Sequence, residues 1–209
     1  MLPATHERLI ADAVNAAAPA LADRIGDLLR GCRDEDTYRW PLAGWRTPAL
    51  GFTHTCRPGS RFGLLLFPSA RSRCAMWMRR AAAASSASRR GECLGHAAHL
   101  LVDAAVPARA AGVWHLSGDP FEAWVESHLD ELLATAPSVE PADRTPASLV
   151  ESLASAAVRY PADTRATPLA AFRLWRPRVA LDESALRAQA VALVPLARGH
   201  LQALFRGAV

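Results

Sequence analysis

Apolar residues recur every three or four positions at both ends of the chain, and this spacing predicts amphipathic helices. Residues 6–30 carry such a face, and Pro19 must divide or kink the run because proline has no amide hydrogen. Apolar residues from Leu186 to Leu204 repeat the spacing after Asp182, which can accept a hydrogen bond as the N-cap. The chain is therefore expected to begin and end in helices.

Further helices are predicted in the second half of the chain. Asp119-Pro120 and Thr145-Pro146 each place a capping side chain before a proline at the first helical position. A third helical pattern starts at Glu92 and must end by Pro107. Together with the terminal segments, these patterns predict five or six amphipathic helices.

Strand and turn patterns interrupt the helices in the middle of the chain. Short alternating runs between residues 50 and 78, separated by proline and glycine turns, predict a small antiparallel sheet. Short strands are also predicted near residues 113–116 and 171–176. Residues 79–90, RRAAAASSASRR, are low in complexity and are expected to form an exposed turn, a linker or the frayed start of a helix.

These patterns predict an α+β fold in which a small antiparallel sheet packs with helices. The 209 residues are enough for one domain, expected to span 1–209. Its expected sub-regions are an N-terminal helical segment (1–31), an arginine-rich strand and loop segment (37–91) and a mainly helical segment (92–209).

Composition excludes some chemistry. The 24 basic residues are all arginine. Without lysine there is no Schiff base, no pyridoxal phosphate anchor and no phosphate loop that ends in lysine. The absence of lysine agrees with a GC-rich codon bias, but that bias does not explain where the arginines lie.

Charge is strongly segregated along the chain. No acidic residue lies between Asp36 and Glu92, whereas ten arginines do. Such a basic stretch attracts anions, and arginine interleaved with tryptophan is typical of surfaces that bind phosphates and stack on bases. The candidate anion-binding residues are Arg57, Arg61, Arg71, Arg73, Arg79, Arg80, Arg89 and Arg90, with Trp40, Trp45 and Trp77 as candidate stacking residues.

This charge pattern predicts a non-catalytic binding or adaptor protein that engages an anionic partner through its middle segment. The partner is expected to be nucleic acid or an acidic protein, the latter as in a bacterial accessory or immunity-type protein. In the alternative interpretation, the chain's own acidic helices, such as the one carrying Glu122 and Glu126, neutralise the arginines internally. Ala-rich helix faces would also permit copies of the chain to associate into a homo-oligomer.

No metal or other cofactor is expected from the motifs. Cys93, His96 and His99 follow one another at steps of three, but a zinc ion would need His54 or a further cysteine to fold over them. The four cysteines form no C-x-x-C pair and are expected to be free thiols in a cytoplasmic protein. We see no secretory signal and no apolar run long enough to cross a bilayer.

One enzyme hypothesis rests on Arg90-Gly91-Glu92-Cys93-Leu94-Gly95 at the start of a predicted helix. This segment resembles the pyrophosphate-binding turn of the coenzyme A-dependent N-acetyltransferases. The resemblance implies a coenzyme A-dependent acyltransferase in which amides at a helix start hold the pyrophosphate. Cys93 departs from the family pattern, which has a glycine there.

Overall fold

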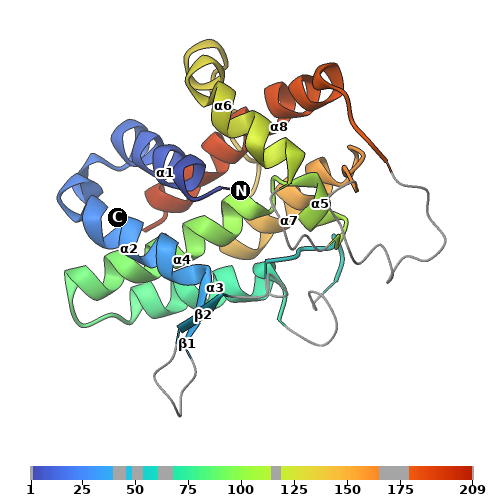
Figure 1. The fold of residues 1–209 in the computed structure, drawn as a ribbon. Coiled ribbons are helices and arrows are strands. Elements are labelled where there is room, and N and C mark those ends of the chain that lie inside the picture. Colours follow the sequence, from blue (N-terminus) through green and yellow to red (C-terminus); the bar gives the residue numbers. More distant parts are fainter. Residues whose placement is uncertain are drawn as a thin grey trace.

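In the computed structural model, the described part of the chain comprises residues 2–39, 46–48, 54–60, 68–113, 119–164 and 179–208. This part is built almost entirely from helices that pack around one another (Figure 1). In chain order the helices are α1 (Pro3–Ala17), the 3-10 helix η1 (Pro19–Arg24), α2 (Ile25–Glu35), α3 (Ala70–Ala82), α4 (Ala87–Asp103), α5 (Pro107–Ala110), α6 (Pro120–Thr135), α7 (Pro146–Ala157) and α8 (Glu183–Arg206).

The predicted α+β fold is wrong. Within the described ranges, the strand elements are β1 (Thr37–Arg39) and β2 (Arg46–Pro48), which pair antiparallel as a small ribbon. No described residue supports the antiparallel sheet expected over 50–78, and residues 70–82 form α3 instead. The strands expected at 61–67 and 171–176, and nearly all of the one at 113–116, fall outside the described residues.

The reason for this error lies in the burial pattern of α3. Its buried residues are Ala70, Cys74, Trp77 and Ala81, at steps of four, three and four, which is the period of a helix. Ser69 caps the helix by accepting a hydrogen bond from the Ser72 amide. Arg79 and Arg80, between the last two buried positions, are exposed. The strand prediction for this segment did not take this helical spacing into account.

Several predicted helix boundaries are confirmed. Asp119, Thr145 and Asp182 each accept a hydrogen bond from a backbone amide at the start of α6, α7 and α8. Pro19 divides the N-terminal run, since α1 ends at Ala17 and η1 begins at the proline. The first helix starts before the predicted residue 6, because Pro3 occupies its first turn.

Helix α4 is the central element of the assembly. It packs against α2 and α3 and also contacts α1, α7 and α8. From Cys93 to Asp103 each of its residues is buried, on all sides of the helix. This all-round burial includes three polar residues, His96, His99 and Asp103, whose placement in the core needs specific partners.

Two glycines allow α2 and α4 to approach closely. A Cβ at Gly31 would overlap the carbonyl oxygen of Glu92, and one at Gly95 would overlap the carbonyl oxygen of Leu28. Only glycine leaves room for backbone contact at both places. This close crossing sets the distance between the end of α2 and the polar residues of α4.

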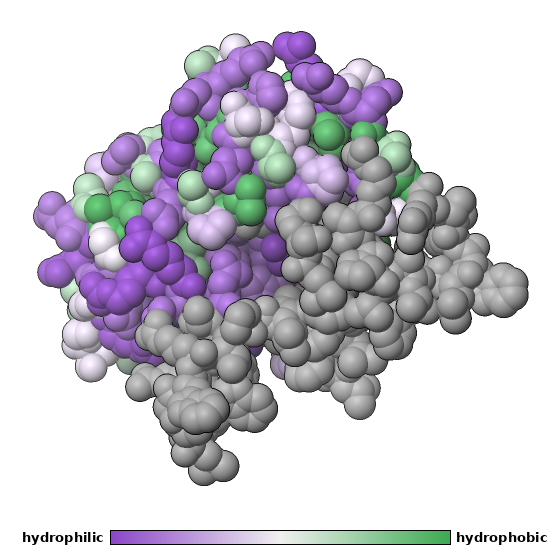
Figure 2. All heavy atoms as spheres, in the orientation of Figure 1, coloured by the Kyte–Doolittle hydropathy of each residue, from purple (hydrophilic) through white to green (hydrophobic). Residues whose placement is uncertain are grey.

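The surface is mixed in character. Figure 2 shows hydrophilic side chains over much of the described surface on that face, with apolar ones scattered among them. The described helices include none with the length and hydropathy required to traverse a lipid bilayer.

Candidate metal centre

A group of titratable side chains lies in the core where apolar residues would be expected. His6 comes from α1, Asp36 is the C-cap of α2, His54 precedes α3, and His99 and Asp103 belong to α4. All but Asp36 are at most 1% exposed. We call these five residues the Asp103 cluster.

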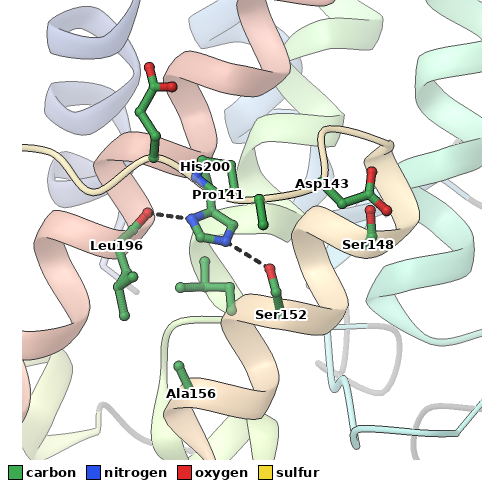
Figure 3. Close-up of a pocket in the computed structure, with 10 residues that line it drawn as sticks. Pro141, Asp143, Ser148, Ser152, Ala156, Leu196 and His200 are labelled. Atoms are coloured by element: carbon green, nitrogen blue, oxygen red, sulfur yellow. Dashed lines mark hydrogen bonds between the residues drawn. The ribbon is translucent and has the colours of Figure 1, made fainter.

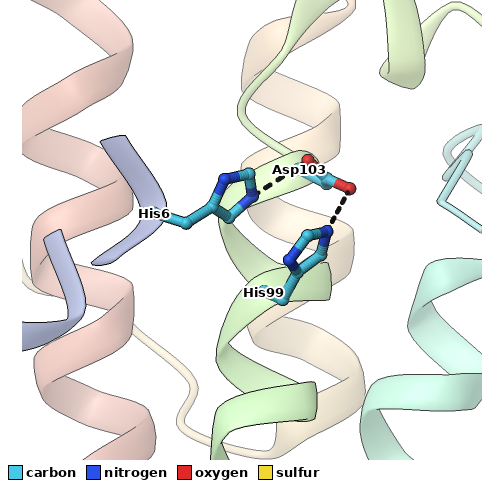
Figure 4. A group of neighbouring side chains, drawn as sticks. All are labelled: His6, His99 and Asp103. Atoms are coloured by element: carbon cyan, nitrogen blue, oxygen red, sulfur yellow. Dashed lines mark hydrogen bonds and ion pairs between the residues drawn. The ribbon is translucent and has the colours of Figure 1, made fainter. Parts of the chain in front are cut away.

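The two carboxylate oxygens of Asp103 face different histidines (Figure 4). Oδ1 lies 3.1 Å from Nε2 of His6. Oδ2 lies 2.6 Å from Nδ1 of His54 and 3.3 Å from Nε2 of His99. Asp103 thus links three imidazoles that come from three separate parts of the chain.

Both ring nitrogens of His6 face oxygens that can only accept a hydrogen bond. Nδ1 lies 3.0 Å from the carbonyl oxygen of Leu2, and Nε2 lies 3.1 Å from the Asp103 carboxylate. The neutral ring carries one proton and can therefore donate to only one of these oxygens. A cation on one nitrogen would leave the proton for the other.

The same reasoning applies to His99. Its Nδ1 lies 3.6 Å from Sγ of Cys32, and Nε2 points the other way. Within 3.4 Å of that nitrogen lie Oδ1 of Asp36, Oδ2 of Asp103 and Nδ1 of His54. Potential metal-ligand atoms of four side chains therefore lie close to one another.

The spacing of the Asp36, His54 and His99 atoms suits a tetrahedral metal ion. Ligands bound to zinc at its usual distances are about 3.4 Å apart along the edges of the tetrahedron. From Nε2 of His99, the distances to Asp36, Asp103 and His54 are 3.4, 3.3 and 3.3 Å, and Asp36 Oδ1 lies 3.9 Å from His54 Nδ1. The 2.6 Å contact between Asp103 and His54 is a hydrogen bond that metal binding would replace.

Burial and neighbouring charges set the protonation of the cluster. Burial opposes ionisation of Asp103, but Arg109 and His99 hold the pKa of its carboxyl well below the usual range. Burial likewise opposes ionisation of Asp36, yet its hydrogen bond with His99 lowers the pKa to about 2. Burial, with the charge of His99, lowers the pKa of His6 to about 4. Both carboxylates are thus ionised and His6 is neutral at pH 7.

His99 is the group that holds a proton in the metal-free protein. Burial lowers its pKa, but the charge of Asp103 and the hydrogen bonds to Asp103 and Asp36 outweigh burial and raise the pKa well above 6.5. A metal ion would displace this proton, because only the neutral imidazole is a ligand.

Two further charged side chains border the Asp103 cluster. Arg109 lies with NH1 3.1 Å from Oδ2 of Asp103 and NH2 3.2 Å from Oε1 of Glu122. Glu122 is 6% exposed, and its pKa is lowered to about 2 because nearby positive charge, including that of Arg109, outweighs its burial. The positive charges of Arg109 and of the chain's N-terminal amino group both lower the pKa values of Asp103 and Glu122.

A second buried network orients the end of α2 that carries Asp36. Oε1 of Glu35 accepts hydrogen bonds from Nε and NH2 of Arg73, at 3.0 and 2.5 Å. Oε2 accepts from Nε1 of Trp77 at 3.1 Å and from Nδ1 of His96 at 2.7 Å, and these two rings are stacked. Because Asp36 follows directly in sequence, the contacts of Glu35 hold it toward the Asp103 cluster.

The sequence trio Cys93, His96 and His99 does not form one site. His96 binds Glu35, whereas His99 turns to Asp103. His54 does fold over His99, as a metal site would require. All four cysteines are free and buried, which agrees with the expected free thiols. His6 and Asp36 were missed because nothing in their local sequence marks them as ligands.

The candidate anion-binding arginines divide into two groups. Arg71, Arg73 and Arg89 pair with the chain's own carboxylates, those of Glu151, Glu35 and Glu92 respectively. Arg57, Arg79, Arg80 and Arg90 are exposed, although Arg90 also donates to the carbonyl of Ala208. Arg61 lies outside the described residues, as do Trp40 and Trp45.

The candidate stacking residue Trp77 and the candidate pyrophosphate-binding segment 90–95 both lie among the described residues. Trp77 is 8% exposed, stacks on His96 and has the Arg80 guanidinium 4.8 Å from its ring centroid, so little of it faces solvent. Residues 90–95 lie inside α4, which begins at Ala87. The Arg90 amide donates to Ser86 within the helix, so this segment is not a turn with free amides.

Comparison with known proteins finds no matching family model and no match among the curated proteins. The function is therefore inferred from the chemistry of the side chains in the Asp103 cluster.

Proposed function

We propose that this protein binds a divalent cation of the zinc class at the Asp103 cluster and uses it for hydrolytic chemistry. One observation carries the proposal: two groups of potential ligand atoms meet at His99. Asp36, His54 and His99 form the first group, with spacings of 3.3 to 3.9 Å, and His6, His99 and Asp103 form the second. These donors come from α1, α2, α4 and the segment before α3, so the fold assembles the site.

The donor types favour a catalytic rather than a structural metal. Structural zinc sites are typically closed and rich in cysteine, whereas imidazole and carboxylate ligands with access to solvent are typical of hydrolytic sites. No thiol joins the metal-ligand groups found among the described residues. The Asp36 side chain is 43% exposed, which gives the otherwise buried cluster a side open to water.

Such a metal would lower the pKa of a bound water and so supply hydroxide near neutral pH. Arg109 would add positive charge beside the reacting group and stabilise negative charge that develops there. Glu122 holds the Arg109 guanidinium in place. These roles predict hydrolysis of an ester rather than redox chemistry, because zinc has no redox function.

Metal titration tests the binding step. Protein stripped with a chelator would be titrated with Zn²⁺, Mn²⁺ and Mg²⁺ by calorimetry, and the Co²⁺ form would be examined by absorption spectroscopy. We expect Zn²⁺ to bind at micromolar or tighter affinity, and the His54→Gln and His99→Gln variants to lose at least a hundredfold. His128→Gln is the matched control, because His128 stacks on Trp124 outside the cluster. Equal affinity in wild type and both cluster variants would refute the site.

Activity would be measured with bis(4-nitrophenyl) phosphate and 4-nitrophenyl acetate. Hydrolysis of either probe should require the metal and disappear in His99→Gln. If the protein binds zinc tightly but hydrolyses neither probe with or without it, the binding proposal stands and the hydrolytic role is withdrawn.

We also propose a second candidate, an anionic partner bound at the end of the α3–α4 hairpin. Arg79 and Arg80 close α3 and are exposed, and no described carboxylate forms an ion pair with either. Arg89 is exposed on the first turn of α4, on the other side of the loop that joins α3 to α4. Charge reversal of Arg79 and Arg80 should abolish salt-sensitive binding to single-stranded nucleic acid or an acidic protein. Reversal of Arg187 and Arg206 on α8 is the control.

A further inference from the structure

A cavity of about 260 Å³ lies between α7, α8 and the segment that connects α6 to α7 (Figure 3). Its walls include Pro141, Leu153, Ala156 and Leu196, and none of its residues belongs to the Asp103 cluster. Ser152 of α7 and His200 of α8 meet in it. This cavity plays no part in the proposed metal chemistry.

The geometry of the Ser152–His200 pair defines the tautomer of the imidazole. Nδ1 of His200 lies 2.7 Å from the carbonyl oxygen of Leu196, which can only accept, so Nδ1 carries the proton. Nε2 is then the unprotonated nitrogen, and Oγ of Ser152 lies 2.8 Å from it. The hydroxyl has a second acceptor, the carbonyl of Leu149, at the longer distance of 3.2 Å.

A hydroxyl bonded to an imidazole that a third group orients is the arrangement of an activated nucleophile. We propose that Ser152 and His200 form a nucleophile–base pair that accepts the acyl group of a small, neutral, apolar ester. Ser152 Oγ attacks the ester carbonyl carbon while its proton passes to Nε2 of His200. The carbon–alkoxide bond then breaks, and the alkoxide takes that proton and leaves as the alcohol. Water, deprotonated by His200, releases the acid and restores Ser152.

The surroundings of the pair suit this role. Ser152 is exposed, whereas His200 beneath it is 3% exposed. Burial lowers the pKa of His200, which keeps the imidazole in its basic form at neutral pH. The Ser148 hydroxyl lines the same cavity one turn before Ser152, where it donates to the carbonyl of Thr145.

The lining also selects the substrate class. The walls are mainly apolar, and Glu140 at the cavity is paired with Arg144 and Arg206. Apolar walls favour an uncharged substrate, and the cavity volume admits only a short acyl chain. A neutral ester of a short-chain acid satisfies both conditions.

The cavity is framed by backbone contacts that fix its shape. The amide of Val139 donates to the carbonyl of Pro195 in α8. At Gly199, next to His200, a Cβ would overlap the carbonyl oxygen of Val139, so the connecting segment lies directly on α8. The base is therefore held on a rigid element, as a catalytic pair requires.

A fluorescent fluorophosphonate tests the nucleophile without dependence on metal. The full-length protein, stripped with a chelator, would be incubated with this probe, and the labelled residue identified by peptide mass spectrometry. We expect stoichiometric labelling at Ser152, a loss of at least tenfold in labelling rate in His200→Gln, and no label in Ser152→Ala. Ser155→Ala, on the same helix but outside the cavity, should label like wild type.

Hydrolysis of 4-nitrophenyl butyrate in the presence of chelator gives the second readout. Its rate should fall to background in Ser152→Ala and increase with pH as His200 becomes neutral. Thermal unfolding of each variant would establish that the fold is kept, and Ser152→Cys, which retains a nucleophile, should keep labelling if Ser152→Ala unfolds. Absence of label at residue 152 in folded wild-type protein, or equal labelling in His200→Gln, would overturn the proposal.

Discussion

Oδ2 of Asp103 lies 2.6 Å from Nδ1 of His54, although 49 positions separate the two residues in the sequence. Asp103 is fully buried and faces His54, His99 and Arg109 through the same oxygen. So much positive and titratable charge around one carboxylate makes Asp103 the organising residue of the cluster. Its replacement should affect both stability and metal binding.

Asp103→Asn removes the charge and keeps the shape of the side chain. In the metal-free protein it leaves the partly buried Arg109 without its main counter-charge, so we expect the free energy of unfolding to fall by about 3 kcal/mol. Zinc affinity should fall at least a hundredfold in calorimetry. Asp143→Asn, at an exposed carboxylate, should leave both quantities unchanged within error. A stable Asp103→Asn protein with wild-type affinity would contradict the assignment.

The stability of the metal-free protein should fall in acid through His6. The pKa of His6 is lowered from 6.5 to about 4 in the folded state, so between these pH values the unfolded chain binds the proton first. Unfolding is therefore favoured as pH falls from 6.5 to 4, by about 2 kcal/mol at pH 4.5. Urea denaturation at pH 7 and pH 4.5, in chelator, measures this loss.

His6→Gln is the matched variant for that experiment, because glutamine does not titrate. Its unfolding free energy should change less between pH 7 and pH 4.5 than that of wild type. Asp36, whose pKa is lowered to about 2, destabilises the protein only at lower pH, below about 3.8, where the unfolded carboxyl takes up its proton. An identical pH dependence in wild type and His6→Gln would show that His6 is not the titrating group.

Glu35→Gln tests whether the Glu35 network positions Asp36. The substitution leaves Arg73 without its carboxylate in a buried setting, and we expect a loss of about 3 kcal/mol in unfolding free energy. Zinc affinity should fall by about ten- to a hundredfold, as is typical when a group that orients a metal ligand is removed. Glu131→Gln, in an exposed pair with Arg187, should cost less than about 1 kcal/mol and leave zinc affinity unchanged.

Gly95→Ala tests the close approach of α2 and α4. The added Cβ would overlap the Leu28 carbonyl, and because backbone cannot yield as a flexible side chain does, we expect a destabilisation of about 3 kcal/mol. Gly26→Ala, on α2 with open space around it, should instead stabilise the protein by about 0.5–1 kcal/mol. Thermal and urea unfolding of both variants measure the difference.

Local signals in the sequence predicted three helix starts correctly. The caps at Asp119, Thr145 and Asp182 depend on contacts within two or three residues, so they are readable without the fold. The strand predicted after the turn at Pro68 was wrong, because a run of six residues does not distinguish a strand from a helix. The longer spacing of Ala70, Cys74, Trp77 and Ala81 identifies the helix, but it becomes clear only once the buried face is known.

The sequence by itself determined the helical ends, the helix caps, the absence of lysine chemistry and the segregation of arginine. These follow from residue identity and short-range backbone geometry. Only the tertiary structure decided which charges meet: it paired Arg73 with Glu35 and brought His6, Asp36 and His54 to Asp103. The physical reason is that metal-ligand geometry depends on distances of a few ångströms between residues far apart in the chain. Those distances follow from how closely the helices pack.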